Sequence, residues 1–159
     1  MDSHLPIDRK QRELVEEFLR LDDWTVRYEH LMRLGERLPP FPEAWRQAGN
    51  RVHGCASLLW LRGLGEPGCL IYRGASDCPM DAGLLAMALS VYSGQPAADI
   101  VASPPRFIFA LGLPSRLSMN RLQGLERLVE RIRRFALQRL MQTHVPVTLN
   151  RGREQRLAR

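Results

Sequence analysis

The sequence predicts an α+β fold in which helices flank a small antiparallel β-sheet. Apolar residues at helical spacing dominate both ends of the chain, whereas two short apolar runs lie near its middle. Strand and helix patterns do not alternate, which argues against a parallel sheet with crossover helices. With 159 residues, of which 45% are hydrophobic, the chain is long enough for one domain with its own core.

Two amphipathic helices open the predicted domain. The first runs from a cap at Asp8 to about Leu21, and the second runs from a cap at Asp22 to a glycine stop at Gly35. Each helix keeps its apolar residues on one face. A proline-rich stretch that cannot be helical then leads into a short helix over residues 42–49.

A β-hairpin is predicted in the middle of the chain. Residues 56–62 and 69–73 are short apolar runs of strand length. The glycines and proline of residues 63–68 are typical of turns, so we expect a loop longer than the tight two-residue type. Cys69, at the start of the second strand, is expected to pack inward.

The remaining elements are helical. A helix over residues 79–94 is apolar on most faces, so it is expected in the core. A short helix over 96–102 and an apolar turn over 107–111 follow. The last long helix begins at a cap on Ser118 and runs to about Leu140.

The net charge of +6 is concentrated at the C-terminal end. Residues 1–120 contain 13 basic and 14 acidic side chains, whereas residues 121–159 contain 10 basic and 3 acidic ones. We therefore assign residues 1–140 to one domain and residues 141–159 to a basic, flexible C-terminal tail. No stacking aromatic is interleaved with the arginines, so a solvated helix face explains them better than nucleic-acid binding does.

The expected location is the cytoplasm. The chain has no apolar run of about 18 residues that would span a membrane. Its start is polar and acidic, without the basic segment and apolar stretch of a signal peptide. Three cysteines are an odd number, and in a reducing compartment we expect free thiols rather than disulfides.

Cys55 is the strongest candidate for chemistry. It lies between Gly54 and Ala56, after a helix end and before the first strand, so a bulky partner can approach it on a loop. Sulfur chemistry requires the thiolate, and Arg51 and His53 are near enough in sequence to lower the pKa of this thiol. The alternative is that Cys55 is simply a small buried hydrophobic residue.

Other chemistry has weaker support. Cys78 precedes a helix N-terminus, which favours a thiolate. A zinc site made of His53, Cys55, Cys69 and Cys78 is disfavoured, because the spacings match no common site. A Cys55–His53 protease pair is not predicted, and hydrolase, phosphate-loop and dinucleotide motifs are missing from the sequence.

Six sequence fragments follow one another between about Leu14 and Ala136. They are Trp24-x-x-Arg27-Tyr28-x-x-Leu31 with Leu34-Gly35 and Leu38-Pro39; Val52-x-Gly54-Cys55-x-Ser57-x-x-Trp60-Leu61; Ser76-Asp77 with Gly83-Leu84; Tyr92-Ser93-Gly94; Leu111-Gly112-Leu113; and Leu117-Ser118-x-x-Arg121-x-x-Gly124-Leu125. In these fragments and their order, the chain resembles the SufE family of sulfur-acceptor proteins.

The resemblance implies a sulfur carrier. Such a protein takes persulfide sulfur from a pyridoxal-phosphate cysteine desulfurase and relays it to iron–sulfur cluster assembly or another sulfur-using pathway. Cys55 is then the acceptor thiol, and the chain activates its partner rather than catalysing alone. It needs no metal or cofactor of its own, since the pyridoxal phosphate belongs to the desulfurase. A monomer or homodimer is expected.

The same resemblance implies supporting residues. Arg121 maps beside the cysteine loop, where it faces the desulfurase, and Asp77 braces the loop. His53, Gly54 and Ser57 belong to the loop itself, as partner-binding or loop-supporting residues. Both Arg121 and Asp77 also have purely structural explanations, as a first-turn surface residue and as a helix cap.

Three points stay open. Met80-Asp81-Ala82 stands where the family has an apolar pair and a basic residue, which leaves the identity of the desulfurase open. Cys78 is an additional thiol and a candidate for resolving a persulfide on Cys55. The alternative function is a non-catalytic regulator that docks on a desulfurase or a sulfur-using enzyme without carrying sulfur.

Overall fold

The structure is a computed structural model that describes residues 6–55 and 57–143. Its elements follow one another as α1 (Ile7–Leu19), α2 (Trp24–Glu36), the short 3₁₀ helices η1 (Glu43–Trp45) and η2 (Ala48–Asn50), β1 (Leu59–Glu66), β2 (Cys69–Ser76), α3 (Pro79–Tyr92), α4 (Ala97–Ala102), α5 (Arg106–Ala110), η3 (Leu113–Ser115) and α6 (Met119–Thr143).

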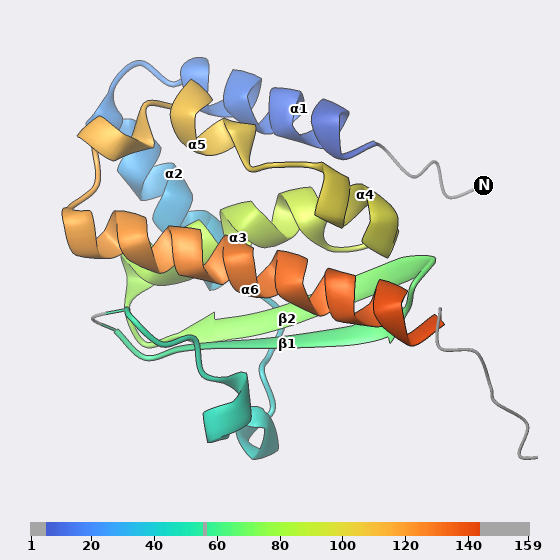
Figure 1. The fold of residues 1–159 in the computed structure, drawn as a ribbon. Helices are drawn as coiled ribbons and strands as arrows, with labels where there is room; N and C mark the ends of the chain where they lie inside the picture. Colours follow the sequence, from blue (N-terminus) through green and yellow to red (C-terminus); the bar gives the residue numbers. More distant parts are fainter. Residues whose placement is uncertain (1–5, 56, 144–159) are drawn as a thin grey trace, which may run out of the picture.

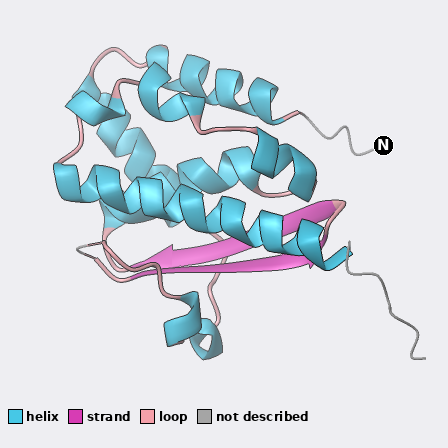
Figure 2. Cartoon of the chain, viewed as in Figure 1, coloured by secondary structure: helices cyan, strands magenta, loops and turns pink. Residues whose placement is uncertain are grey.

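The architecture is a helical layer packed on one face of a two-stranded sheet. β1 and β2 pair antiparallel from Leu59 opposite Ser76 to Glu66 opposite Cys69. α3 packs against β2, and α6 packs against β1. The short helices η1 and η2 lie on the other side of the hairpin (Figure 1). Helices and strands are segregated along the chain, as Figure 2 shows, which confirms the predicted α+β class.

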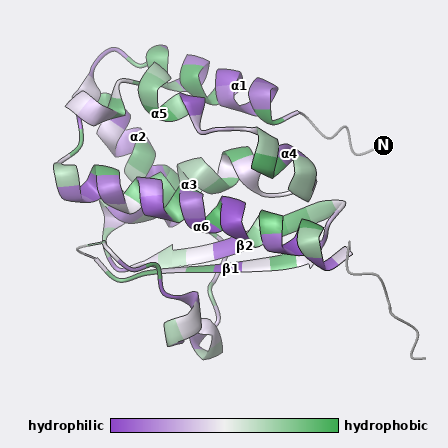
Figure 3. Ribbon diagram, viewed as in Figure 1, coloured by the Kyte–Doolittle hydropathy of each residue, from purple (hydrophilic) through white to green (hydrophobic). Residues whose placement is uncertain are grey.

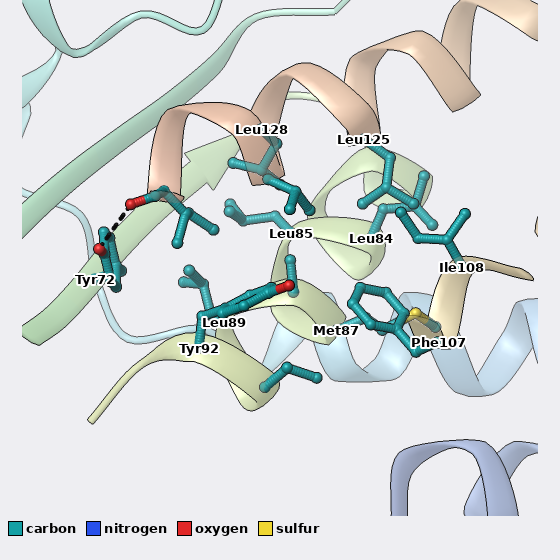
Figure 4. Close-up of a cluster of buried hydrophobic side chains, with 14 of the residues drawn as sticks. Tyr72, Leu84, Leu85, Met87, Leu89, Tyr92, Phe107, Ile108, Leu125 and Leu128 are labelled. Atoms are coloured by element: carbon teal, nitrogen blue, oxygen red, sulfur yellow. Dashed lines mark hydrogen bonds between the residues drawn. The ribbon is translucent and has the colours of Figure 1, made fainter. Parts of the chain in front are cut away.

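α3 is the centre of the core, as its apolar sequence predicts. Leu84, Leu85 and Met87 are buried, and α3 contacts α1, α2, α6 and β2. Figure 4 shows Leu125 and Leu128 of α6 among these side chains. Burying each leucine stabilises the fold by about 2 kcal/mol, so this contact anchors α6 over the sheet.

The outer helices are amphipathic. α1 and much of α6 are coloured as hydrophilic in Figure 3, whereas α4 and α5 are mainly hydrophobic. On α6 the buried residues recur at helical spacing and include Leu125, Val129 and Ile132. The polar face of α6 is therefore turned to solvent, and its apolar face covers α3 and β1.

The hairpin loop is shorter than expected. Glu66 pairs directly with Cys69, so only Pro67 and Gly68 connect strands that are eight residues each. Gly63 and Gly65 are instead strand residues, and Gly68 stays in the turn. A Cβ at Gly63 would collide with the ring of Phe135. The prediction that Cys69 packs inward is also wrong, since the alternating burial of β2 leaves Cys69 exposed at the hairpin tip.

Two helix caps also differ from expectation. α1 begins at Ile7 after Pro6, so Asp8 lies in the first turn and pairs with Arg106 at 3.0 Å. Asp23, not Asp22, caps α2, because its Oδ1 accepts a hydrogen bond of 3.0 Å from the Val26 N–H. An aspartate one residue away cannot reach that N–H with the same backbone geometry.

Gly35 does not end its helix. α2 continues to Glu36, and a Cβ on Gly35 would lie 2.7 Å from the backbone nitrogen of Gly83 in α3. The glycine is therefore needed for close approach of two helices rather than for a left-handed cap. The cap of α6 is as predicted, since the Arg121 N–H donates to the Ser118 hydroxyl.

The segments between and after these elements also differ in detail. Residues 42–49 form η1 and part of η2 instead of one short helix. α6 runs to Thr143, a few residues past the expected end at about Leu140. Most of the predicted basic tail, residues 144–159, lies outside the described residues.

Candidate functional site

The loop that carries Cys55 is closed at its base by the start of the sheet. Arg51 bridges to Trp60 in antiparallel fashion, and the Val52 N–H donates a 2.8 Å hydrogen bond to the Leu59 carbonyl. Val52 itself is buried. Among the described residues of this loop, Cys55 reaches the N-terminal half of α6, where it lies against Gly124.

Asp77 holds the end of this loop that leads into β1. Its Oδ1 accepts a 2.9 Å hydrogen bond from the Leu58 N–H, and its own N–H donates to the Leu58 carbonyl at 3.3 Å. Cys78 occupies the N-cap position of α3, without a side-chain cap bond. The geometry of Asp77 is that of a loop brace and not that of a helix cap.

Cys55 lies against α6 at a glycine. A Cβ added to Gly124 would come within 2.9 Å of the Cys55 sulfur, so the missing side chain makes room for the thiol. The half-buried sulfur lines a pocket of about 160 Å³ between the loop, α3 and α6. The pocket is lined by Cys55, Ser57, Leu59, Asp81, Leu84, Ser118, Asn120, Arg121, Gly124, Leu125 and Leu128.

Gly54 and Arg127 fix the chain just before Cys55. Gly54 has a φ of +88°, in the left-handed region that favours glycine. A Cβ at this position would also collide with the Arg127 side chain of α6. The loop and α6 thus fit together through two glycines, Gly54 on one side and Gly124 on the other.

Burial raises the pKa of the Cys55 thiol, and the negative charge of Asp81 raises it further. Arg127 is the positive charge that opposes them. The expectation that Arg51 and His53 lower the pKa of this thiol is therefore wrong. His53 is exposed on the loop, and the bridge to Trp60 ties Arg51 into the sheet instead.

Arg121 connects a second thiol to the pocket. Its Nη1 lies 3.6 Å from the Cys78 sulfur and 3.6 Å from Oδ1 of Asp81. Burial acts to raise the pKa of Cys78, but hydrogen bonds from the backbone at Asp81 and Met80 and from Ser57 outweigh it, so the pKa is lowered. The pKa values of the two thiols beside this pocket are therefore shifted in opposite directions, upward for Cys55 and downward for Cys78.

The structure brings together three of the six predicted site residues at the pocket, namely Cys55, Ser57 and Arg121. Gly54 and Asp77 support the loop but do not line the pocket, and His53 faces solvent. Sequence reasoning missed Arg127 and did not place Asp81 in the pocket. The three-residue spacing of Arg121, Gly124 and Arg127 on one helix face is the signal that would have found Arg127.

No metal centre is formed by the described residues, since no three histidine, cysteine, aspartate or glutamate side chains there are grouped to hold an ion. Cys69 lies at the hairpin tip, opposite Glu66. All three cysteines are free thiols. Within residues 6–55 and 57–143, none of the helices combines the length and apolar character needed to cross a bilayer.

The structure is thus an α+β domain whose cysteine-bearing loop packs on a glycine of its last helix. Residues 12–136 match the SufE family, described as the Fe-S metabolism associated domain. The chain belongs to the SufE family.

Individual relatives agree with that assignment. An uncharacterized SufE-like protein of Rhizobium etli is 40% identical over 129 residues, which cover 78% of this chain and 87% of that protein. The sulfur acceptor protein CsdE of Escherichia coli is 35% identical over 117 residues, 72% of this chain and 80% of its own. The solution structure of a hypothetical protein from Thermus thermophilus has a TM-score of 0.71, at 21% identity, covering 87% of this chain and 99% of that one.

Proposed function

We propose that the protein accepts persulfide sulfur from a cysteine desulfurase onto Cys55 and relays it to iron–sulfur cluster assembly or another sulfur-using pathway. The observation that carries the proposal is the position of Cys55. It stands on a projecting loop, over Gly124, in a pocket that also holds a guanidinium and a carboxylate. Membership of the SufE family, and similarity to a protein named as a sulfur acceptor, support it.

The proposed reaction is a thiolate exchange. The Cys55 thiolate attacks the outer sulfur of the desulfurase persulfide, forming a new S–S bond on Cys55 while the desulfurase thiolate leaves. The pyridoxal phosphate that generates the persulfide belongs to the partner. In this proposal the chain itself supplies a thiol, its approach path and the charges around it.

The charges around Cys55 favour the neutral thiol at rest. Burial and Asp81 both disfavour the thiolate, and an inert thiol is protected from oxidants and alkylating agents. Docking of a desulfurase that draws the loop away from Asp81 and out of its apolar cover would reverse both effects. Arg127 remains as the charge that favours the thiolate.

Arg121 is the proposed partner contact at the mouth of the pocket. Its side chain is 39% exposed, so it can meet a carboxylate or a sulfur anion of a docked protein. His53, exposed on the same loop, is a further contact point. The cytoplasmic location and the monomeric or homodimeric state stay predictions.

Turnover of a cysteine desulfurase tests the proposal against the regulator alternative. We expect the wild-type protein to stimulate release of sulfur from cysteine, and the Cys55→Ser protein to lose that stimulation while keeping its circular dichroism spectrum. Cys69→Ser, at the exposed hairpin tip, is the matched control and should stimulate like wild type. Full stimulation by the Cys55→Ser protein would establish a regulator that carries no sulfur.

A further inference from the structure

Cys78 is a second thiol that the proposed function does not use. It occupies the N-cap of α3, and its N–H donates to the Ser76 hydroxyl at 3.2 Å. Its sulfur accepts a hydrogen bond from Nη1 of Arg121 at 3.6 Å. Because a guanidinium is positively charged and binds anions, this contact favours the thiolate form of Cys78.

Cys78 and Cys55 share the same neighbours. Arg121 and Ser57, which both line the Cys55 pocket, also hydrogen-bond to the Cys78 sulfur. Asp81 lines the pocket as well, its side chain is only 14% exposed, and its charge acts on both thiols. The two sulfurs therefore flank one compact group of polar side chains.

The two thiols differ in their readiness to react. Burial and Asp81 keep Cys55 protonated, whereas backbone and Ser57 hydrogen bonds favour the thiolate of Cys78. At rest the thiolate form is thus more favoured at Cys78 than at Cys55, the proposed acceptor. Cys69, the third thiol, lies exposed at the far tip of the hairpin and shares none of these neighbours.

We infer that Cys78 is a second sulfur-carrying thiol of this site, to which the sulfane sulfur received by Cys55 moves within the same molecule. The inference rests on the proposed function of Cys55. The Arg121 guanidinium contacts the sulfur that would receive the transferred sulfur atom.

The step balances without an outside reactant. The Cys78 thiolate attacks the outer sulfur of the Cys55 persulfide, an S–S bond forms on Cys78, and the S–S bond on Cys55 breaks. The persulfide proton ends on the Cys55 sulfur, so a neutral thiol is restored there and a persulfide anion remains on Cys78. One negative charge stays beside Arg121 before and after transfer.

Attack on the inner sulfur is the competing step. It would join Cys55 to Cys78 as a disulfide and expel hydrosulfide, and a dithiol reductant would be needed in every cycle. Transfer to the outer sulfur needs no such co-reactant and keeps the cargo on the protein. Transfer to the outer sulfur is therefore the step that we propose.

Peptide mapping by mass spectrometry tests the inference. The wild-type, Cys55→Ser, Cys78→Ser and Cys69→Ser proteins are each incubated with a cysteine desulfurase and cysteine, then alkylated and digested. We expect extra sulfur on both Cys55 and Cys78 of the wild type and of Cys69→Ser. In Cys78→Ser the sulfur should accumulate on Cys55, and in Cys55→Ser it should be lost from Cys78 as well. Serine is a favoured N-cap residue, so α3 should survive the Cys78 change.

Each other outcome has one meaning. Sulfur on Cys55 but not on Cys78 of the wild type overturns the internal transfer and leaves the proposed function standing. Sulfur on neither residue overturns the proposed function itself. Sulfur on Cys78 of the Cys55→Ser protein would show that the desulfurase loads Cys78 directly. A Cys55–Cys78 disulfide with released sulfide would show attack on the inner sulfur. Either result overturns the relay.

A mixing experiment checks that transfer occurs within one molecule. Cys78→Ser protein loaded on Cys55 is separated from the desulfurase and mixed with an equal amount of Cys55→Ser protein. We expect no sulfur on Cys78 of the second protein in the time that the wild type needs for its own transfer. Labelling of that Cys78 at the wild-type rate would contradict transfer within the molecule.

Discussion

At the scale of single residues, the Cys55 thiol is governed by burial and by two opposite charges. Burial and Asp81 raise its pKa, and Arg127 acts against them. Asp81 comes from α3 and Arg127 from α6, so each long helix of the site contributes one charge. The pocket therefore favours the protonated form of the Cys55 thiol.

Replacing Asp81 by asparagine should make Cys55 more reactive near neutral pH. The carboxylate charge of Asp81 disfavours the thiolate, so its removal should lower the pKa of Cys55 and increase the thiolate fraction. In the wild type, alkylation of Cys55 should keep rising with pH above the ordinary range for a thiol. The measurement is the rate of iodoacetamide labelling of the Cys55 peptide from pH 6 to 10.

The matched control for Asp81→Asn is Asp99→Asn. Asp99 is exposed on α4, outside the Cys55 pocket. The Asp99→Asn change removes the same charge as Asp81→Asn does. Its labelling profile should overlay that of the wild type. An Asp81→Asn profile that also overlays the wild type would contradict the assigned role of the Asp81 charge.

The site could be predicted from sequence only where its residues belong to a motif. Cys55, Ser57 and Arg121 lie in fragments that point to the pocket, and the structure places all three there. The charges that set the thiol come from residues distant in sequence, Asp81 and Arg127, which neighbour Cys55 only after folding. Proximity in sequence misled in the case of His53, because a loop residue beside the cysteine can still point to solvent.

At the scale of elements, close contact of α2 and α3 depends on glycine. A Gly35→Ala change should destabilise the protein by about 1–3 kcal/mol, because the added methyl meets the α3 backbone. In an isolated helix the same change would stabilise by about 1 kcal/mol, so the sign of the effect is informative. Urea unfolding followed by circular dichroism measures the free energy of unfolding.

Gly49→Ala is the control for this substitution. A Cβ at Gly49 has no atom within 4 Å, so the free energy of unfolding should change by less than about 0.5 kcal/mol. If Gly35→Ala proves as stable as Gly49→Ala or the wild type, the α2–α3 contact is looser than described.

The brace between Asp77 and the cysteine loop makes a second prediction for an element. Asp77→Ala removes the 2.9 Å hydrogen bond to the Leu58 N–H and should lower the free energy of unfolding by about 1 kcal/mol. The freed loop should also expose Cys55, so its alkylation should speed up. Asp22→Ala removes an exposed carboxylate that caps nothing and should change neither quantity. A loop brace is excluded if Asp77→Ala and Asp22→Ala behave alike.

At the scale of the whole molecule, two buried tyrosines tie distant segments together. The Tyr72 hydroxyl donates to the Ile132 carbonyl and the Tyr92 hydroxyl to the Ser103 carbonyl, each at 2.9 Å. Burial raises the pKa of Tyr72, and burial raises the pKa of Tyr92 to about 12 against the opposing charges of Arg133 and Arg106. The folded state therefore favours the protonated form of both hydroxyls.

Stability should therefore fall when the pH rises above about 10. The unfolded chain releases tyrosine protons near the ordinary pKa of 10.0, before the folded chain does, so the unfolded state is favoured as pH increases. Each buried tyrosine contributes a slope of up to about 1.4 kcal/mol per pH unit. Thermal melts from pH 8 to 11 measure this, and the double change Tyr72→Phe with Tyr92→Phe should flatten the curve. A wild-type melting temperature that stays constant to pH 11 would contradict it.

Much of the architecture could be predicted from the order and spacing of apolar residues. The core position of α3, the hairpin and the long last helix all follow from periodicity. Two of the errors concern glycines: Gly35 and Gly63 suggest a stop and a turn, but they are required by contacts with α3 and Phe135. Such contacts are tertiary, so local sequence does not reveal them.

The central claim is tested most directly by the mass of the intact protein after incubation with a cysteine desulfurase and cysteine, followed by peptide mapping. The account predicts the gain of sulfur on the Cys55 peptide of the wild type, and no gain on that peptide in the Cys55→Ser protein. A desulfurase that binds the wild-type protein and forms its own persulfide, yet leaves Cys55 unmodified, would contradict the sulfur-acceptor role.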